Sequence, residues 1–199
     1  LGALGFLSTG DENSPGNYGI FDQAMALTWV YENIRAFKGD PEQITVFGPG
    51  AGAASAGLLA LAPRTRHMVS KVIAQSGSPL ADWALIVDKY RAQNTSRVFA
   101  EKLGCSIESS YKLVQCLTWG RSDIDLGNSD IQPQVGMFPW APVLDHNFTV
   151  LRDTFDDNWR ASDWHFFTEA PEDSVKEEKY RRDFAYMAGV TTQEGASVL

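Results

Sequence analysis

The sequence predicts an α/β protein with a mostly parallel central sheet and helices on both of its faces. Three observations support this fold class: short β-branched runs at 44–48 and 71–77, a helical pattern at 18–37 before them, and a small-residue stretch at 50–61 between them. Strands that alternate with helices pair in parallel, and the crossover helices cover the sheet.

The chain opens with LGALGFLSTG (1–10), which we interpret as the end of a strand. Turn-forming residues fill 10–19 and predict a loop. Apolar residues then recur at helical spacing from Tyr18 to Phe37. Asn17 is the predicted N-cap of this helix, and Gly39 is its predicted stop.

The middle of the chain alternates strand and helix signals. ITVFG (44–48) predicts a buried strand, and the Gly/Ala-rich stretch 50–61 predicts a helix whose small residues allow close packing on a sheet. KVIAQSG (71–77) predicts a second buried strand. The segment 88–103 predicts another helix, which ends at Gly104.

The C-terminal part contains a long irregular segment, 120–183, which is rich in Asp, Pro and Trp and predicts excursions from the sheet with one helix in their last third. FAYMAGV (184–190) predicts a returning strand, and TTQEGASVL (191–199) begins the next loop and helix. No starting Met or signal-peptide pattern is visible. We therefore expect residues 1–199 to be an internal fragment of one larger domain.

Composition excludes several classes of protein. Hydrophobic residues make 44% and charged residues 21% of the chain, which is ordinary for a folded globular protein. No run approaches the ~20 apolar residues of a membrane helix. The net charge of -8 argues against nucleic-acid binding, which needs a basic face. No phosphate loop or metal-ligand spacing is present, so neither a cofactor nor a metal is predicted.

The two cysteines, Cys105 and Cys116, fit neither a zinc site nor a redox motif. The apolar pattern between them predicts a short helix that a disulfide would tie to the preceding turn, but two free thiols explain the spacing equally well. Two glycosylation sequons, at Asn94 and Asn147, favour an extracellular and oxidising setting. Asn94 is the less certain site because it lies on a helical stripe with apolar residues.

The stretch ITVFGPGAGAAS (44–55) matches the frame of a nucleophile elbow, G-x-S-x-G, in which a strand turns sharply into a helix. Gly48 and Gly52 are the flanking glycines, and we expect neighbouring backbone to lie too close for a Cβ at each. The centre is Gly50 and not serine, and Pro49 precedes it. Glycine has no nucleophile, so no acyl-enzyme forms here, whereas its freedom at unusual φ preserves the turn.

No other residue is predicted to replace the missing nucleophile. Ser55 lies five residues into the helix, about 7.5 Å along its axis. Ser76 and Ser78 follow the second strand and are predicted to hydrogen-bond in the turn. The three histidines have no spacing to a catalytic partner and are predicted to be non-catalytic: His67, His146 and His165.

These residues resemble the type B carboxylesterase and cholinesterase family. The family's long signature is similar to residues 2–48, from GALGFLSTG to EQITVFG. VIAQSGS (72–78) and GVTTQEGASVL (189–199) are similar to later landmarks of the family. The resemblance implies an α/β-hydrolase fold across nearly the whole chain, except for about 150–170.

The resemblance also implies roles for individual positions. Gly50 stands where the family has its nucleophilic serine, and Ala51 stands where a backbone N–H joins the oxyanion hole. Glu194 stands where the family has its triad acid. Cys105 and Cys116 match a family disulfide. Glu194 is no sign of activity, because an acid that orients a histidine has no function without the serine.

Within the family, an elbow without serine resembles the cholinesterase-like adhesion members, neuroligins among them. FGPGAG (47–52), IAQSGSPLADWALIVDKYRAQNTSRV (73–98) and FPWAPVLDHNFT (138–149) are similar to one of these members. The resemblance implies a non-catalytic ectodomain of a plasma-membrane protein at cell junctions. Its expected partner is a protein, either a different one or a second copy of itself.

Two alternatives to adhesion remain open on the sequence, a hydrolase with an atypical nucleophile and a small-molecule sensor that uses the old active-site gorge. Four aromatic residues in the irregular segment are candidate interface anchors, although a patch buried by the rest of the domain explains them equally well: Trp159, Trp164, Phe166 and Phe167.

Overall fold

The computed structural model of the protein describes residues 1–128, 131–132, 138–146 and 165–198. These residues form two compact units, each built from two stretches of chain. The first unit contains residues 1–21 and 85–168, and the second contains residues 22–84 and 169–199. Helix α2 (Tyr18–Asn33) begins in the first unit and continues into the second.

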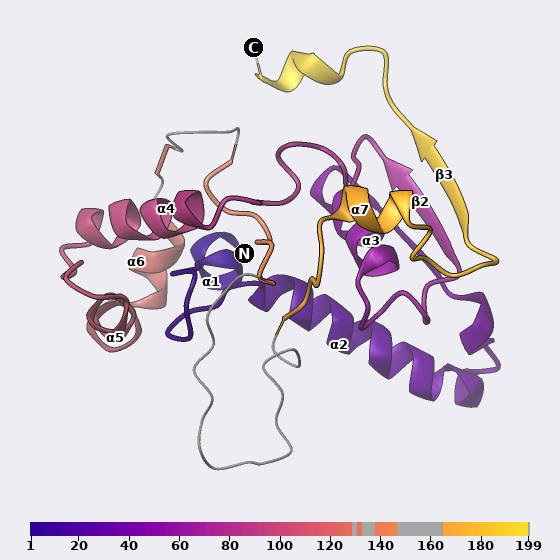
Figure 1. Ribbon diagram of the computed structural model, residues 1–199, viewed down its shortest axis with the longest axis horizontal. Helices are drawn as coiled ribbons and strands as arrows, with labels where there is room; N and C mark the ends of the chain where they lie inside the picture. Colours follow the sequence, from indigo (N-terminus) through magenta and orange to yellow (C-terminus); the bar gives the residue numbers. More distant parts are fainter. Residues whose placement is uncertain (129–130, 133–137, 147–164, 199) are drawn as a thin grey trace. The chain divides into compact units, whose positions relative to one another are not determined.

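The second unit is organised around a three-stranded parallel sheet of order β1-β2-β3, of which β2 and β3 are labelled side by side in Figure 1. The strands are β1 (Thr45–Pro49), β2 (Lys71–Gln75) and β3 (Ala185–Gly189). All three were predicted from the sequence, to within two residues at each end. Because the strands are parallel, their carboxyl ends lie at one edge of the sheet and their amino ends at the other.

Helix α3 (Ala51–Leu61) packs against β1 and β2. Most of its side chains are small and buried, as predicted. A Cβ at Gly57 would lie only 2.5 Å from Cγ of Pro79, so the helix approaches this loop at a distance that only glycine permits. The other face of the sheet is more open, and Phe47 is 70% exposed there.

Shorter helical segments complete the second unit: the 3₁₀ turns η1 (Ile34–Phe37), η2 (Pro41–Gln43) and η4 (Glu194–Val198), and α7 (Pro171–Lys176). The predicted stop at Gly39 needs a correction. Lys38 is the residue with left-handed backbone (φ 65°), and the Gly39 N–H donates to the carbonyl of Ile34 at 2.9 Å. The helix therefore ends in a Schellman-like bond whose left-handed position precedes the glycine.

The first unit is helical: α1 (Gly2–Phe6), α4 (Lys89–Lys102), α5 (Ser110–Gly120) and α6 (Asp123–Asn128). The predicted strand at 1–10 is wrong, because α1 occupies residues 2–6 of it. Ala3 and Leu7, one helical turn apart, are buried in a cluster with Phe99 and Leu113. A short apolar run does not distinguish a buried strand from a buried helix. Helix α6 was also not predicted.

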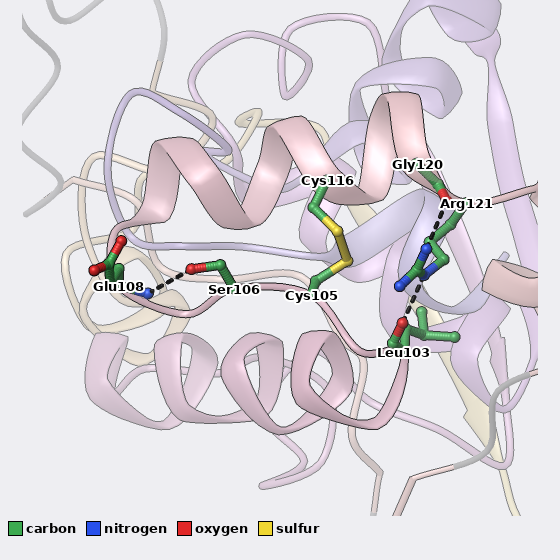
Figure 2. The surroundings of a disulfide bond; sticks show 7 residues. All are labelled: Leu103, Cys105, Ser106, Glu108, Cys116, Gly120 and Arg121. Atoms are coloured by element: carbon green, nitrogen blue, oxygen red, sulfur yellow. Dashed lines mark hydrogen bonds between the residues drawn. A yellow bond between two sulfur atoms is a disulfide. The ribbon is translucent and has the colours of Figure 1, made fainter.

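The predicted helix at 88–103 is confirmed as α4. The Asp88 side chain accepts the N–H of Tyr90 at 2.9 Å, and Gly104 follows the helix with φ 71°. A Cys105–Cys116 disulfide joins the loop after α4 to α5, with the two Cα atoms 5.7 Å apart (Figure 2). The sequence had left disulfide and free thiols open, and the structure contains the disulfide that the family resemblance implied.

Asn17 stands at the predicted N-cap position, since its carbonyl accepts the N–H of Phe21 at 2.9 Å, but its side chain bonds elsewhere and does not cap the helix. Its backbone is left-handed (φ 63°), and its side chain is fully buried. The side-chain amide donates to the carbonyl of Val143 at 2.9 Å and accepts the Val143 N–H at 2.8 Å. The side-chain amide thus pairs with the backbone of Val143 as a neighbouring β-strand residue would, and it fixes the start of α2 to the segment around Val143.

Phe166 and Phe167 are buried core residues of the first unit, so they are not exposed interface anchors. Their N–H groups donate to the two carboxylate oxygens of the buried Asp145, at 2.6 and 2.8 Å. The Phe166 ring packs edge-on against Phe21, with centroids 5.0 Å apart. The other two proposed anchors, at positions 159 and 164, lie outside the described residues.

Candidate functional site

The elbow forms where β1 ends and α3 begins, at the carboxyl edge of the sheet. Gly50 joins the two elements with φ 54° and ψ -117°, a conformation that L side chains rarely adopt. Its N–H donates to the carbonyl of Gln75 at 2.8 Å, and its carbonyl accepts the N–H of Ala54 at 3.1 Å. The turn is thus bonded to β2 on one side and to α3 on the other, with no side chain at its tip.

The backbone around the elbow is crowded at two glycines. A Cβ at Gly48 would lie 3.0 Å from the Cα and carbonyl carbon of Gly52, as predicted for a flanking glycine. A Cβ at Gly77 would lie 2.3 Å from the carbonyl oxygen of Gly50. The prediction for Gly52 is wrong, since a Cβ there would make only an ordinary 3.6 Å contact with Pro49. Gly48 and Gly77 are therefore the positions near the elbow where a residue with a Cβ would be too close to neighbouring backbone.

The central position itself is open. No heavy atom lies within 4 Å of a Cβ built on Gly50, so a side chain there would meet no steric obstacle among the described residues. Ala51, the first residue of α3, is exposed. Its N–H is one of the first N–H groups of α3, which have no acceptor within the helix itself.

Glu194 lies at the same edge of the sheet. Its carboxylate accepts the hydroxyl of Ser76 at 2.6 Å and the backbone N–H of Thr191. These bonds hold the pKa of Glu194 below its ordinary value, although the side chain is exposed, and the bond from Ser76 has the largest effect. Ser76 has left-handed backbone (φ 55°), and its N–H donates to the carbonyl of Gly189 at 2.8 Å.

Gly50 and Glu194 are thus each hydrogen-bonded to one of two consecutive residues, Gln75 and Ser76, at the carboxyl end of β2. Gln75 accepts the elbow N–H, and Ser76 holds the acid. The predicted turn roles of Ser76 and Ser78 are confirmed, because the Ser78 hydroxyl accepts the N–H of Leu80 at 3.1 Å. The requirement for glycine at Gly77 was not predicted from the sequence, where its signal is a glycine in the turn directly after the strand and Ser76.

The remaining sequence candidates lie elsewhere. His67 precedes β2, at the amino edge of the sheet, and its ring packs edge-on against Tyr31. His146 and His165 belong to the first unit. Ser55 lies inside α3. Among the described residues, no group of three His, Cys, Asp or Glu could hold a metal, and no helix has the length and apolar character to cross a membrane.

Comparison with known proteins assigns the fold family. The carboxylesterase family model matches residues 1–199, the entire chain. The chain belongs to the carboxylesterase family. This family has the α/β-hydrolase fold, and the parallel sheet with α3 after the elbow is a part of that fold.

Relatives of two kinds are similar to the chain. Rat neuroligin-2 is 44% identical over 145 residues, covering 73% of the chain and 17% of the relative. Mouse neuroligin-3 is 43% identical over 145 residues, with the same coverage. Mouse bile salt-activated lipase is 34% identical over 201 aligned positions, covering 98% of the chain and 30% of the lipase. The chain thus spans less than a third of the length of these relatives.

Of the two glycosylation sequons, the structure describes the one at Asn94. Asn94 is exposed on α4, while Thr95 beside it is buried. Asn147 lies outside the described residues. An exposed asparagine is compatible with a glycan, so Asn94 stays a predicted glycosylation site.

Proposed function

We propose that this chain belongs to a non-catalytic, cholinesterase-like ectodomain. The elbow geometry at Gly50 carries the proposal, because the backbone of a nucleophile turn is present without a nucleophile. In this proposal Gly50, Ala51 and Glu194 are vestigial positions of the serine, the oxyanion donor and the triad acid. Losing such a nucleophile costs a hydrolase on the order of a millionfold in rate.

The proposed role of the whole protein is adhesion at cell contacts. Neuroligin-2 and neuroligin-3 are the relatives with the higher identity, and the sequence resemblance groups neuroligins with the serine-less adhesion members. Within that group we propose a gliotactin-like protein of septate junctions, concentrated at the points where three epithelial cells meet. FGPGAG (47–52) and FPWAPVLDHNFT (138–149) are the stretches that favour this member.

Further features of the proposal follow from this role. Residues 1–199 would be one part of a single α/β-hydrolase domain outside the plasma membrane. Asn94 and Asn147 would carry glycans, in keeping with the Cys105–Cys116 disulfide of an oxidising compartment. The partner would be a protein at the opposing cell, either a different protein or a second copy.

A labelling experiment tests the loss of catalysis. The full protein would be incubated with an activated acyl ester and then with a fluorescent organophosphate. We expect no turnover above the buffer rate and no covalent label. Esterase turnover that the organophosphate abolishes, with label on the native protein, would refute the proposal.

A cell-aggregation experiment tests adhesion separately. Cells that express the full protein would be mixed with unlabelled cells of the same kind and with epithelial cells. We expect clusters that contain the expressing cells, and soluble ectodomain should disperse them. Normal surface expression without any clustering would count against adhesion while leaving the catalytic result unchanged.

A hydrolase with an atypical nucleophile is the second candidate. It is favoured by the similarity to bile salt-activated lipase, which extends over 98% of the chain. The same labelling experiment separates the two functions, since an atypical nucleophile would carry the organophosphate at a residue other than Gly50.

A further inference from the structure

The glycosylation sequon Asn94-Thr95-Ser96 lies inside helix α4 (Lys89–Lys102). The N-x-S/T pattern marks an acceptor because the transferase recognises the hydroxyl two residues after the asparagine as well as the asparagine itself. Successive residues of an α-helix are rotated by about 100°, so side chains two residues apart point about 200° apart. A helical sequon therefore cannot present its asparagine and its hydroxyl to one enzyme at the same time.

Ser96, which carries the hydroxyl of this sequon, faces the interior of the first unit. It is 0% exposed, and its hydroxyl donates to the carbonyl of Ser8 at 2.6 Å. Ser8 is itself buried. Asn94, in contrast, is exposed on the other side of the helix. The folded protein thus presents the acceptor asparagine to solvent and buries the hydroxyl by which a sequon is recognised.

The segment that covers Ser96, residues 8–10, packs closely on α4. A Cβ on Gly10 would lie 2.9 Å from Nε2 of Gln93, the residue before the sequon. Phe99, on the next turn of the helix, is 0% exposed and belongs to a buried cluster that includes residues of α1 and α5. All of these residues belong to the first unit. Ser96 becomes accessible only when α4 leaves this cluster.

Before α4 docks on this cluster, its own sequence does not keep the sequon closed. The helix has 14 residues, among them Asn, Thr, Ser and Val, which are weak helix formers. Isolated helices of up to about 12–15 residues are only marginally stable in water. The Cys105–Cys116 disulfide, which ties the loop after α4 to α5, cannot form until Cys116 has been made. At about 5–20 residues per second, synthesis from Asn94 to Cys116 takes roughly 1–4 s.

We infer that Asn94 receives its glycan only before α4 docks on residues 8–10, and that folding closes the site. A chain whose α4 docks first keeps an unmodified Asn94. The timing of folding therefore sets the share of molecules that carry this glycan. Such timing rests on the proposed function, because the transferase acts on proteins of the secretory pathway.

The donor of the glycan is an oligosaccharide joined to a lipid through pyrophosphate. A bond forms between Nδ2 of Asn94 and C1 of the first sugar, while the bond between C1 and the pyrophosphate oxygen breaks. The lipid pyrophosphate leaves with the electron pair, and the side-chain amide loses one proton. The step needs neither an oxidant nor a reductant.

A transfer assay on the full protein, made without glycans, tests the timing. One sample is native with its disulfide intact, and the other is reduced and alkylated so that it stays unfolded. Each is incubated with a purified eukaryotic oligosaccharyltransferase and its lipid-linked donor, and the tryptic peptide 92–97 is then measured by mass spectrometry. We expect modification of Asn94 to be at least about 10-fold faster in the unfolded sample, because reaction at a closed site follows the small population of open molecules.

Variants show whether docking of α4 controls access. Ser96→Ala should abolish modification of Asn94 in both samples. Phe99→Ala removes a buried side chain of α4 and should make the native sample react faster than wild type. Tyr90→Ala is the matched control, because Tyr90 is 68% exposed on the same helix, and it should leave the rate unchanged. If Phe99→Ala is unfolded by circular dichroism, Leu113→Ala in the same cluster replaces it.

Three results would overturn the inference. The first is equal modification of the native and the unfolded protein, since α4 would then not close the sequon. The second is no modification in either sample, because Asn94 would then not be an acceptor. The third is equal rates for the native core variant and Tyr90→Ala. Protein from cells without a glycan at either Asn94 or Asn147 would instead contradict the proposed extracellular setting, and the comparison in vitro would stand.

Discussion

The crowding at the elbow predicts a definite stability order for three glycine-to-alanine variants. Gly77→Ala places a methyl group 2.3 Å from the carbonyl oxygen of Gly50, well inside the shortest contacts that Cβ atoms make. Gly50→Ala meets no neighbour but keeps a φ of 54°. Gly52→Ala has both space and a helical position. The three variants therefore separate steric overlap, backbone strain and helix propensity at one turn.

The magnitudes follow from these three causes. Overpacking against backbone costs about 1–3 kcal/mol, and Gly77→Ala should reach the upper end because the displaced carbonyl also accepts the Ala54 N–H. A left-handed conformation costs a non-glycine residue about 1–2 kcal/mol, which applies to Gly50→Ala. Gly52→Ala should gain about 0.5–1 kcal/mol, since alanine is the better helix residue.

Urea unfolding of the full protein, followed by tryptophan fluorescence, measures the three free energies of unfolding. The expected order, from most to least stable, is Gly52→Ala, wild type, Gly50→Ala and Gly77→Ala. Comparable m-values would show that the variants share one native state. If Gly77→Ala is as stable as wild type, the close approach of Gly77 to the carbonyl oxygen of Gly50 is wrong. The geometry described for the elbow would then be wrong as well.

Three further changes have expected outcomes. Replacing both cysteines with serine should lower the free energy of unfolding by about 2–4 kcal/mol, measured in urea, and no difference from wild type under oxidising conditions would contradict the disulfide. Ser76→Ala should raise the pKa of Glu194 toward its ordinary value, because the hydroxyl bond is the main cause of the lowering. A lowered carboxyl pKa stabilises the fold above the ordinary glutamate pKa, and this stabilisation is lost as the pH falls through the pKa of the folded state. The free energy of unfolding of Ser76→Ala should therefore fall less in acid than that of wild type. An NMR titration in which the pKa of Glu194 is the same in both proteins would refute this prediction. Asn17→Ala should cost about 1–3 kcal/mol in thermal or urea unfolding for each Val143 group left without a partner, and a neutral result would show that water replaces the amide.

The parallel core was predictable because local pattern and tertiary role agree there. Strands β1, β2 and β3 are short β-branched or small-residue runs with turn signals, and α3 follows from the glycines and alanines that a sheet-packed helix needs. The sharp turn from β1 into α3 was predictable for the same reason, because glycines directly after a buried strand indicate such a turn, although of the two flanking glycines only Gly48 lies too close to other backbone for a Cβ. Asp88 and Gly104 likewise specified both ends of α4 locally.

The errors occurred where distant contacts decide local structure. Residues 2–6 form a helix because Ala3 is buried against a cluster assembled from α4 and α5. Asn17 looks like a cap, but Val143, more than a hundred residues later, takes both of its amide groups. For Phe166 and Phe167 the sequence left exposed anchors and a buried patch equally open, and the carboxylate of Asp145, which holds their backbone inside the core, decides for burial.

The open space at Gly50 has a consequence for substitutions at this position. Gly48 and Gly77 leave the turn its close backbone contacts, and among the described residues no heavy atom lies within 4 Å of a Cβ at position 50. A serine there would add one hydroxymethyl group at the cost of a left-handed backbone, and the sheet would need no rearrangement. On the proposed function, a catalytic and a non-catalytic elbow would differ in this fold by one substituent on the same frame.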